Sequence, residues 1–215
     1  MKDYNEEYFY MMAGGVNFPA VDFTGASQIG NSFMFFEEEA IDDQTVVPLK
    51  FSDPVPRKPQ LADVHAMASN RVISTRIKEI LESFSLKNVQ FVPATVEDKN
   101  GNEIEGYYIP HIYNLIRCVD TQKSEYRDKS RNANIPVYDI KKLVLDNEVL
   151  DQIPLEDRLV FALEEQGLKR LYHRSVVEKI LALKPDGVAF YQLSTYDPKK
   201  PFQAAYMDYL LNGED

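Results

Sequence analysis

The stretch from Ser69 to Val96, SNRVISTRIKEILESFSLKNVQFVPATV, decides the fold, because its hydrophobic period changes once along its length. Ser69 has a side-chain oxygen that can accept a hydrogen bond from the free N–H groups of a first helical turn. The apolar residues that follow are spaced like one face of an α-helix: Ile73, Ile77, Ile80, Leu81 and Phe84. From Val89 the pattern becomes that of a strand. The stretch therefore predicts a central amphipathic helix capped by Ser69, followed by a strand.

The strand that starts at Val89 is expected to form an antiparallel pair with residues 106–119. The pair Asn100-Gly101 lies between the two segments and is a strong signal for a tight turn. Residues 106–119 are too apolar for either face to lie in water, so we place this strand centrally in a sheet. Pro110 cannot donate a ladder hydrogen bond, which predicts a bulge or an exposed edge at that point.

The N-terminal third has fewer periodic apolar residues. Residues 8–12 and 46–51 are predicted strands, the second at a sheet edge because it contains Pro48. Residues 53–59 contain three prolines and should form a stiff, extended connector. We expect residues 1–60 to be an irregular segment with short strands that belongs to the same domain as an α+β core at residues 61–215.

The C-terminal half repeats this mixture of strands and short helices. Ser175-Val-Val-Glu178 fits the capping box that opens a helix, which should end at 184–187. The other predictions are a strand at 135–145, a hairpin made by 159–163 and 168–172 (a helix is the alternative), a strand at 187–193 and a docking helix after Pro201. The fold class that results is α+β, with a mostly antiparallel sheet packed against the central helix and a few short helices.

Composition restricts the kind of protein. The net charge of −10 over 215 residues would repel a nucleic-acid backbone, so we expect no nucleic acid as a partner. The first residues lack the apolar region of a secretory signal, and no apolar run approaches the ~18 residues of a membrane span. We therefore expect a cytoplasmic protein with no membrane association.

Residues that could perform chemistry are few. His65, His111 and His173 lie in different segments and lack the short spacing of a helical metal motif. If they converged in the fold, they could bind a metal or act as acid and base. Cys118, the one cysteine, lies in an apolar segment and should be an inert buried thiol. We predict no cofactor, no metal and no catalytic residue.

An acidic run is the strongest candidate for recognition. Its members can pair with Arg and Lys of a protein partner, or form a solvated loop: Glu37, Glu38, Glu39, Asp42 and Asp43.

The order of features along residues 63–193 resembles a bacterial family of small domains that is partly assigned as immunity proteins of polymorphic toxin systems. The features are Asp63 before the predicted helix, the apolar strand that ends in Cys118-Val119-Asp120, Ile140-Lys-Lys-Leu-Val-Leu-Asp146, the strand pair at 159–172, Ser175-Val-Val-Glu178, and Gly187-Val-Ala-Phe190.

This resemblance implies a cytoplasmic protein that binds a cognate toxin and neutralises it by occlusion, without being an enzyme. An acidic surface would suit a toxin with a basic cleft. The alternative is a small-molecule enzyme with a histidine-containing cleft.

Overall fold

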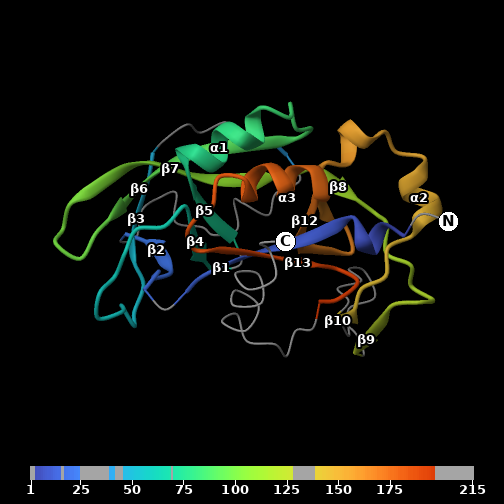
Figure 1. The fold of residues 1–215 in the computed structure, drawn as a ribbon, viewed down its shortest axis with the longest axis horizontal. Helices are drawn as coiled ribbons and strands as arrows, with labels where there is room; N and C mark the ends of the chain where they lie inside the picture. Colours follow the sequence, from blue (N-terminus) through green and yellow to red (C-terminus); the bar gives the residue numbers. More distant parts are fainter. Residues whose placement is uncertain are drawn as a thin grey trace.

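Two sheets and a pair of helices make up the fold, in which α1 and α3 lie side by side over the region where the sheets meet (Figure 1). A computed structural model of the chain describes residues 3–15, 17–24, 39–41, 46–68, 70–127 and 139–196. The mixture of mainly antiparallel strands and a few short helices is the α+β class that the sequence predicts.

The six-stranded sheet contains the predicted central hairpin. Its spatial order is β2 (Val21–Phe23), β3 (Val47–Phe51), β6 (Val89–Glu97), β7 (Glu103–Ile112), β5 (Asn70–Ser74) and β4 (Val64–Met67). Neighbouring strands are antiparallel, except for β3 and β6, which are parallel. The turn at Asn100-Gly101 joins β6 to β7, and Gly101 takes the positive φ of 81° that favours glycine. The hairpin and the central place of β7 are therefore confirmed.

The five-stranded sheet combines the N-terminal strand with strands from the second half of the chain. Its order is β13 (Val188–Gln192), β1 (Tyr8–Ala13), β12 (Gln166–His173), β11 (Val160–Leu163) and β8 (Leu115–Ile116). The N-terminal strand β1 lies inside this sheet, antiparallel to both neighbours. A separate pair is formed by β9 (Glu125–Arg127) and β10 (Asp139–Lys142).

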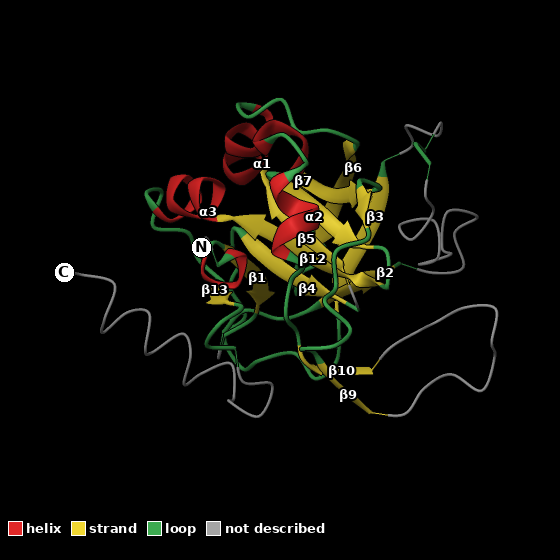
Figure 2. Cartoon of the chain, turned by 90° about the vertical axis from the view of Figure 1, so that its right-hand side faces the viewer, coloured by secondary structure: helices red, strands yellow, loops and turns green. Residues whose placement is uncertain are grey.

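The helices are short (Figure 2). They are the 3-10 helices η1 (Tyr4–Glu6) and η3 (Leu155–Arg158) and the α-helices α1 (Thr75–Glu82), α2 (Asn147–Asp151) and α3 (Arg174–Leu181). The apolar faces of α1 and α3 share one hydrophobic cluster with strands of both sheets, through Ile77 and Leu81 of α1 and Val176, Val177 and Ile180 of α3. Because isolated helices of eight residues are unstable in water, this shared burial is what holds them folded.

Asp63 ties the two sheets together just before β4. Its carboxylate is almost buried and accepts hydrogen bonds from the Ser74 hydroxyl (2.7 Å), the Arg76 guanidinium (3.0 Å) and the Asp186 N–H (3.1 Å). Ser74 and Arg76 lie at the start of α1, whereas Asp186 lies just before β13 in the other sheet. One side chain therefore fixes the first turn of α1 and the point where the sheets approach each other.

The predicted start of the central helix is wrong. Residues 70–74 form β5, and α1 begins at Thr75 with Ser74 in the N-cap position, whereas Ser69, the predicted cap, lies outside the described residues. The sequence Arg71-Val-Ile73 suits a strand as well as a helix. Pairing decides between them, because Ile73 lies opposite Val64 of β4 and Tyr108 of β7 and is fully buried there.

Other boundaries also differ from prediction. Helix α3 is capped by His173 rather than Ser175, and α2, which Asp146 caps, was not predicted. The strand with Pro48 is not at an edge, since the three-residue β2 pairs beside it and the Pro48 carbonyl accepts the Thr24 N–H. The segment 106–119 divides between β7 and β8, and the hairpin's irregularity lies between Ala94 and Val96 instead of at Pro110.

The strands predicted at 8–12 and 187–193 and the hairpin at 159–172 are confirmed as β1, β13 and β11–β12. Of the strand predicted at 135–145, residues 139–142 form β10, and residues 135–138 lie outside the described residues. The connector at 53–59 contains no helix or strand. The predicted helix after Pro201 lies outside the described residues. The division at residue 60 stays a prediction, although β1 and β3 pair with strands from beyond it.

Replacement of Asp63 by Asn tests its role as a tie. Asn has one acceptor oxygen where Asp63 has two, so at least one of the three donors loses its partner. We expect the free energy of unfolding to fall by about 1–3 kcal/mol in urea titrations. The matched control is Asp157→Asn, whose carboxylate forms a half-exposed pair with Lys87 at 3.0 Å and should cost less than ~1 kcal/mol. Equal losses in the two variants would contradict this role.

Candidate functional site

Of the five acidic residues in the predicted recognition segment, the structure describes only Glu39. Glu39 is exposed. Glu37, Glu38, Asp42 and Asp43 lie outside the described residues, so their role in partner binding stays a prediction.

The described part of this segment is attached to two side chains of the β6–β7 hairpin. The Glu39 carbonyl accepts a hydrogen bond from Nε2 of His111 at 2.7 Å. The Gln90 amide binds both backbone groups of Ile41, accepting from its N–H at 2.7 Å and donating to its carbonyl at 3.2 Å. Gln90 and His111 are directly opposite each other in the hairpin register. The central hairpin thus holds the backbone of the acidic run at residues 39 and 41.

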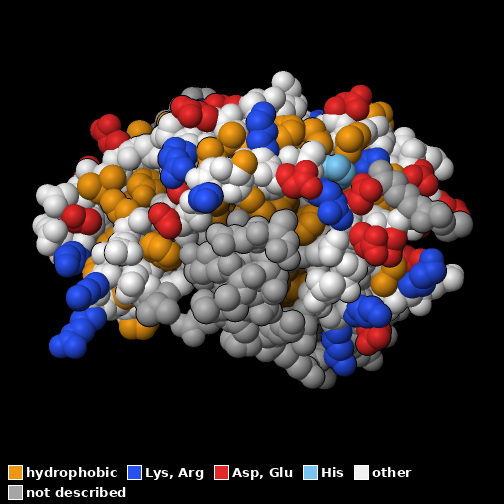
Figure 3. Space-filling model, viewed as in Figure 1, with side chains coloured by type: hydrophobic (Ala, Val, Ile, Leu, Met, Phe, Trp, Pro, Cys, Tyr) orange, Lys and Arg blue, Asp and Glu red, His pale blue; other side chains and the backbone are white. Residues whose placement is uncertain are grey.

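The described surface outside this segment has mixed charge. Figure 3 shows Asp and Glu side chains interspersed with Lys and Arg over the face in view, with no large area of one sign. Several charged side chains of the described residues are paired, as in Lys78–Glu82 at 2.6 Å and Lys123–Asp120 at 2.7 Å. Clusters of unpaired acidic side chains are therefore not a general feature of the face that Figure 3 shows.

Each histidine has its own local partners, and the structure does not bring them together. His65 is buried on β4, where its Nδ1–H donates to the Pro19 carbonyl at 2.8 Å and its Nε2 accepts the Ala62 N–H at 3.0 Å. Burial lowers the pKa of His65, so the ring is held neutral. His111 supports residue 39, as described above.

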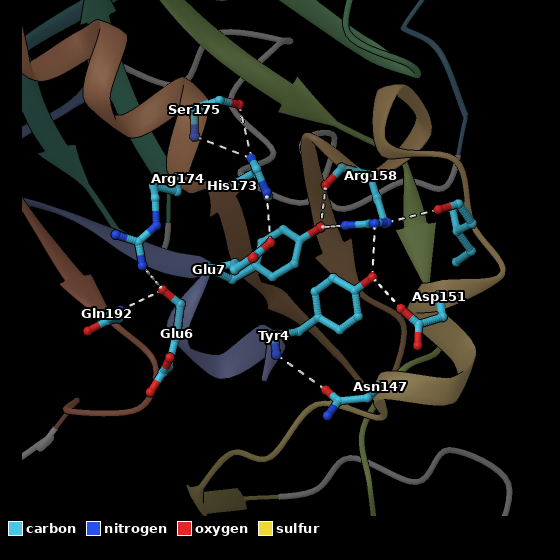
Figure 4. Close-up of polar contacts among 12 residues, drawn as sticks. Tyr4, Glu6, Glu7, Asn147, Asp151, Arg158, His173, Arg174, Ser175 and Gln192 are labelled. Carbon is cyan, nitrogen blue, oxygen red and sulfur yellow. Dashed lines mark hydrogen bonds and ion pairs between the residues drawn. The ribbon is translucent and has the colours of Figure 1, made fainter. Parts of the chain in front are cut away.

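His173 is the histidine that meets a carboxylate. Its Nδ1 accepts hydrogen bonds from the Ser175 N–H (3.2 Å) and hydroxyl (2.9 Å), and its Nε2 lies 3.2 Å from a Glu7 carboxylate oxygen (Figure 4). These contacts cap α3 and attach it to the segment before β1. The described surface has one pocket beside Tyr10 and another beside Asn114, and no histidine is in the lining of either.

Cys118 is buried, as the sequence predicts. Burial and the nearby carboxylates of Glu165 and Asp146 raise the pKa of its thiol, which therefore stays protonated. It packs in the hydrophobic cluster beneath the five-stranded sheet.

A buried arginine organises the polar contacts at the N-terminal end of the fold (Figure 4). The Arg158 guanidinium donates to the Tyr8 hydroxyl (2.9 Å), the Tyr4 hydroxyl (3.1 Å) and the Ile153 carbonyl (2.8 Å). The Tyr4 hydroxyl in turn donates a hydrogen bond to the Asp151 carboxylate at 2.7 Å. The arginine also lies 4.7 Å from the centre of the Tyr4 ring. Its charge is thus compensated by hydroxyls, a carbonyl, an aromatic face and, through Tyr4, a carboxylate.

Sequence reasoning missed this group because its members are about 150 residues apart and no local motif connects them. Burial raises the pKa of Tyr8 to about 12, so the hydroxyl is protonated and donates to the Arg158 carbonyl at 3.0 Å. The arrangement fixes η1 and β1 against α2 and η3. It offers rigidity and no free reactive group.

In the described ranges, no set of three His, Cys, Asp or Glu side chains is close enough to hold a metal ion. Nor does that part of the chain include a helix with the length and apolar character needed to cross a membrane.

These features are those of an α+β protein whose buried polar groups fasten its elements to one another. The sequence model of the Immunity protein family (Imm11) matches residues 37–195 of the chain. The chain belongs to this family. A toxin-immunity function, with a cognate toxin as binding partner, follows from that membership. No curated protein sequence matches the chain.

Tyr4→Phe tests whether the arginine group stabilises the fold. The change removes the hydroxyl between Arg158 and Asp151 and leaves a buried guanidinium with one partner fewer. We expect a loss of about 1–3 kcal/mol in the free energy of unfolding. In the control Tyr113→Phe, a ring that stacks on His111 loses a hydroxyl with no described hydrogen bond, and stability should change by less than ~0.5 kcal/mol. A Tyr4→Phe variant as stable as the control would refute the assignment.

The buried neutral His65 predicts a pH dependence of stability. Its pKa is lowered in the fold from the 6.5 of an unperturbed histidine, so the unfolded state binds the proton first. This contribution is complete above pH ~6.5 and is lost as the pH falls below it, by at most ~1.4 kcal/mol per pH unit. Urea titrations of wild type and of His65→Gln, which does not titrate, should therefore show a stability difference that narrows from pH 7.5 to pH 5.5. A stability difference that stays constant from pH 7.5 to pH 5.5 would disprove this role of His65.

Proposed function

We propose that the chain neutralises its cognate toxin in the cytoplasm by occlusion, and that the acidic run at 37–43 is the part of its surface that meets the toxin. Occlusion requires a folded surface that covers the toxin's active site or blocks the path of its substrate. It requires no nucleophile, acid or cofactor in the immunity protein itself.

The observation that carries this proposal is the attachment of residues 39–41 to the hairpin. Three hydrogen bonds from Gln90 and His111 hold the backbone at Glu39 and Ile41. Buried Ile41 adds an apolar anchor in the cluster that includes Val92 and Ile109. A segment fixed in this way has less conformational entropy to lose when a partner binds. Anchored main chain with acidic side chains at either side suits a recognition surface better than a solvated loop.

Charge supports the same proposal. Five acids within seven residues supply half the magnitude of the net charge of −10 on a short segment. Such a concentration attracts a basic surface, speeds encounter and disfavours acidic competitors. The toxin surface that fits it is rich in Lys and Arg, as in the cleft of an enzyme that handles nucleic acid.

Neutralising the run tests the proposal. Glu37, Glu38, Glu39, Asp42 and Asp43 are replaced together by Gln or Asn, and binding to the toxin encoded beside this gene is measured at low and high salt. We expect the association rate at low salt to fall about tenfold or more, and its salt dependence to weaken. Cells that express the toxin should also lose protection.

The matched control removes the same number of charges from exposed positions elsewhere, by Glu→Gln changes at Glu79, Glu103, Glu105, Glu164 and Glu178. It should keep most of the association rate and all of the protection. If both five-fold variants lose the same amount, net charge and not this segment determines recognition. If neither loses any, the acidic run is not the binding surface.

A further inference from the structure

Although the chain is acidic overall, it has a pocket that is lined by positively charged side chains. The pocket has a volume of about 300 Å³ and lies between β1, the end of β12 and the turn before β5. Arg71, Lys169 and Arg170 contribute to its lining, and none of the described residues that line it is acidic. Three cations around one small cavity are unexpected in a chain with a net charge of −10.

Arg71 is held in a fixed position by neutral groups. Its guanidinium donates to the carbonyls of Asn70 (2.6 Å) and Met11 (3.2 Å) and lies 3.7 Å from the Met12 sulfur. Among the described residues it forms no ion pair, and its Nε is buried without a hydrogen-bond partner. Two neutral carbonyls orient the group but leave its charge uncompensated, which is costly in a buried site.

Arg170 adds a second guanidinium close to the first. It is 9% exposed, and burial together with the charge of Arg71 lowers its pKa. Burial lowers the pKa of Arg71 as well. Both groups remain charged at neutral pH, because a guanidinium does not lose its proton in proteins at that pH. Two like charges in one pocket favour an anion between them.

Tyrosine rings form the remaining walls. Tyr10 and Tyr196 meet edge to face with centroids 4.8 Å apart, and the Lys169 ammonium lies 5.0 Å from the centre of the Tyr10 ring. Tyr172 lies in the lining between the strands and is almost fully buried. Aromatic walls around a few converging charges are usual in small-molecule sites, and 300 Å³ is at the lower end of their size range.

We propose that this pocket binds a small molecule through an oxyanion, a carboxylate or a phosphate group, which Arg71 and Arg170 hold while the tyrosine rings contact its body. No residue of the acidic run belongs to the described lining of this pocket, and its occupation does not depend on the toxin.

Thermal unfolding with two probes tests the proposal. Sodium phosphate and sodium benzoate are each compared with sodium chloride at equal ionic strength. At about ten times the dissociation constant, a bound probe should raise the Tm by about 3–6 °C. A larger effect of phosphate indicates a phosphate-bearing ligand, and a larger effect of benzoate indicates an aromatic carboxylate. If neither exceeds chloride, the proposal is wrong.

Variants locate the effect. Arg71→Gln should abolish the response, whereas Arg117→Gln, an exposed arginine away from the pocket, should keep it. Lys169→Gln, at the half-buried rim, provides a second variant if Arg71→Gln does not fold, and calorimetric titration should show at least about threefold weaker binding for it. An unchanged response in Arg71→Gln, or in Lys169→Gln when that variant is the one available, would mean that the probe binds elsewhere and would overturn the assignment.

Discussion

The carboxylate of Asp63 is the constraint on which the arrangement of the sheets depends. It receives three donors from two separate parts of the chain, the start of α1 and the turn before β13. Arg76 extends the connection by donating to the Leu183 carbonyl, just after α3. The helices α1 and α3 are therefore placed by polar contacts at one end, while their apolar faces share one core. Because neither helix is long enough to be stable alone, the position of both follows from this junction.

The sequence predicts local structure well where a turn or an apolar period determines it. The Asn100-Gly101 hairpin, the β11–β12 hairpin and α3 are examples. The start of α1 could not be placed, because Val72 and Ile73 fit a helix and a strand equally, and only their partners on β4 and β7 select the strand. Helix α2 had a signal in Asp146, whose side chain caps it, but the apolar period of five residues is too short to recognise.

The acidic run at 37–43 shows the same contrast between features that a short stretch of sequence reveals and features that depend on distant residues. Its acidic residues are visible in the sequence, whereas the side chains that hold its backbone, Gln90 and His111, come from strands about 50 and 70 residues further along. The Arg158 group and the cationic pocket are built in the same way from distant segments, and no spacing in the sequence connects Tyr4 to Arg158 or Arg71 to Arg170. The histidines, which attracted a catalytic hypothesis, serve instead to join backbone segments.

The interior position of β1 has a consequence for biosynthesis. Strand β1 pairs with β12 and β13, which end at residues 173 and 192. It therefore does not have both partners until almost all of the described chain has left the ribosome. The hairpin β6–β7, in contrast, needs only neighbouring residues and can form earlier. Long-range pairing of this kind slows folding and leaves an apolar strand exposed during synthesis. Strand β1, with its aromatic and methionine side chains, is therefore the segment of the nascent chain that most needs a chaperone.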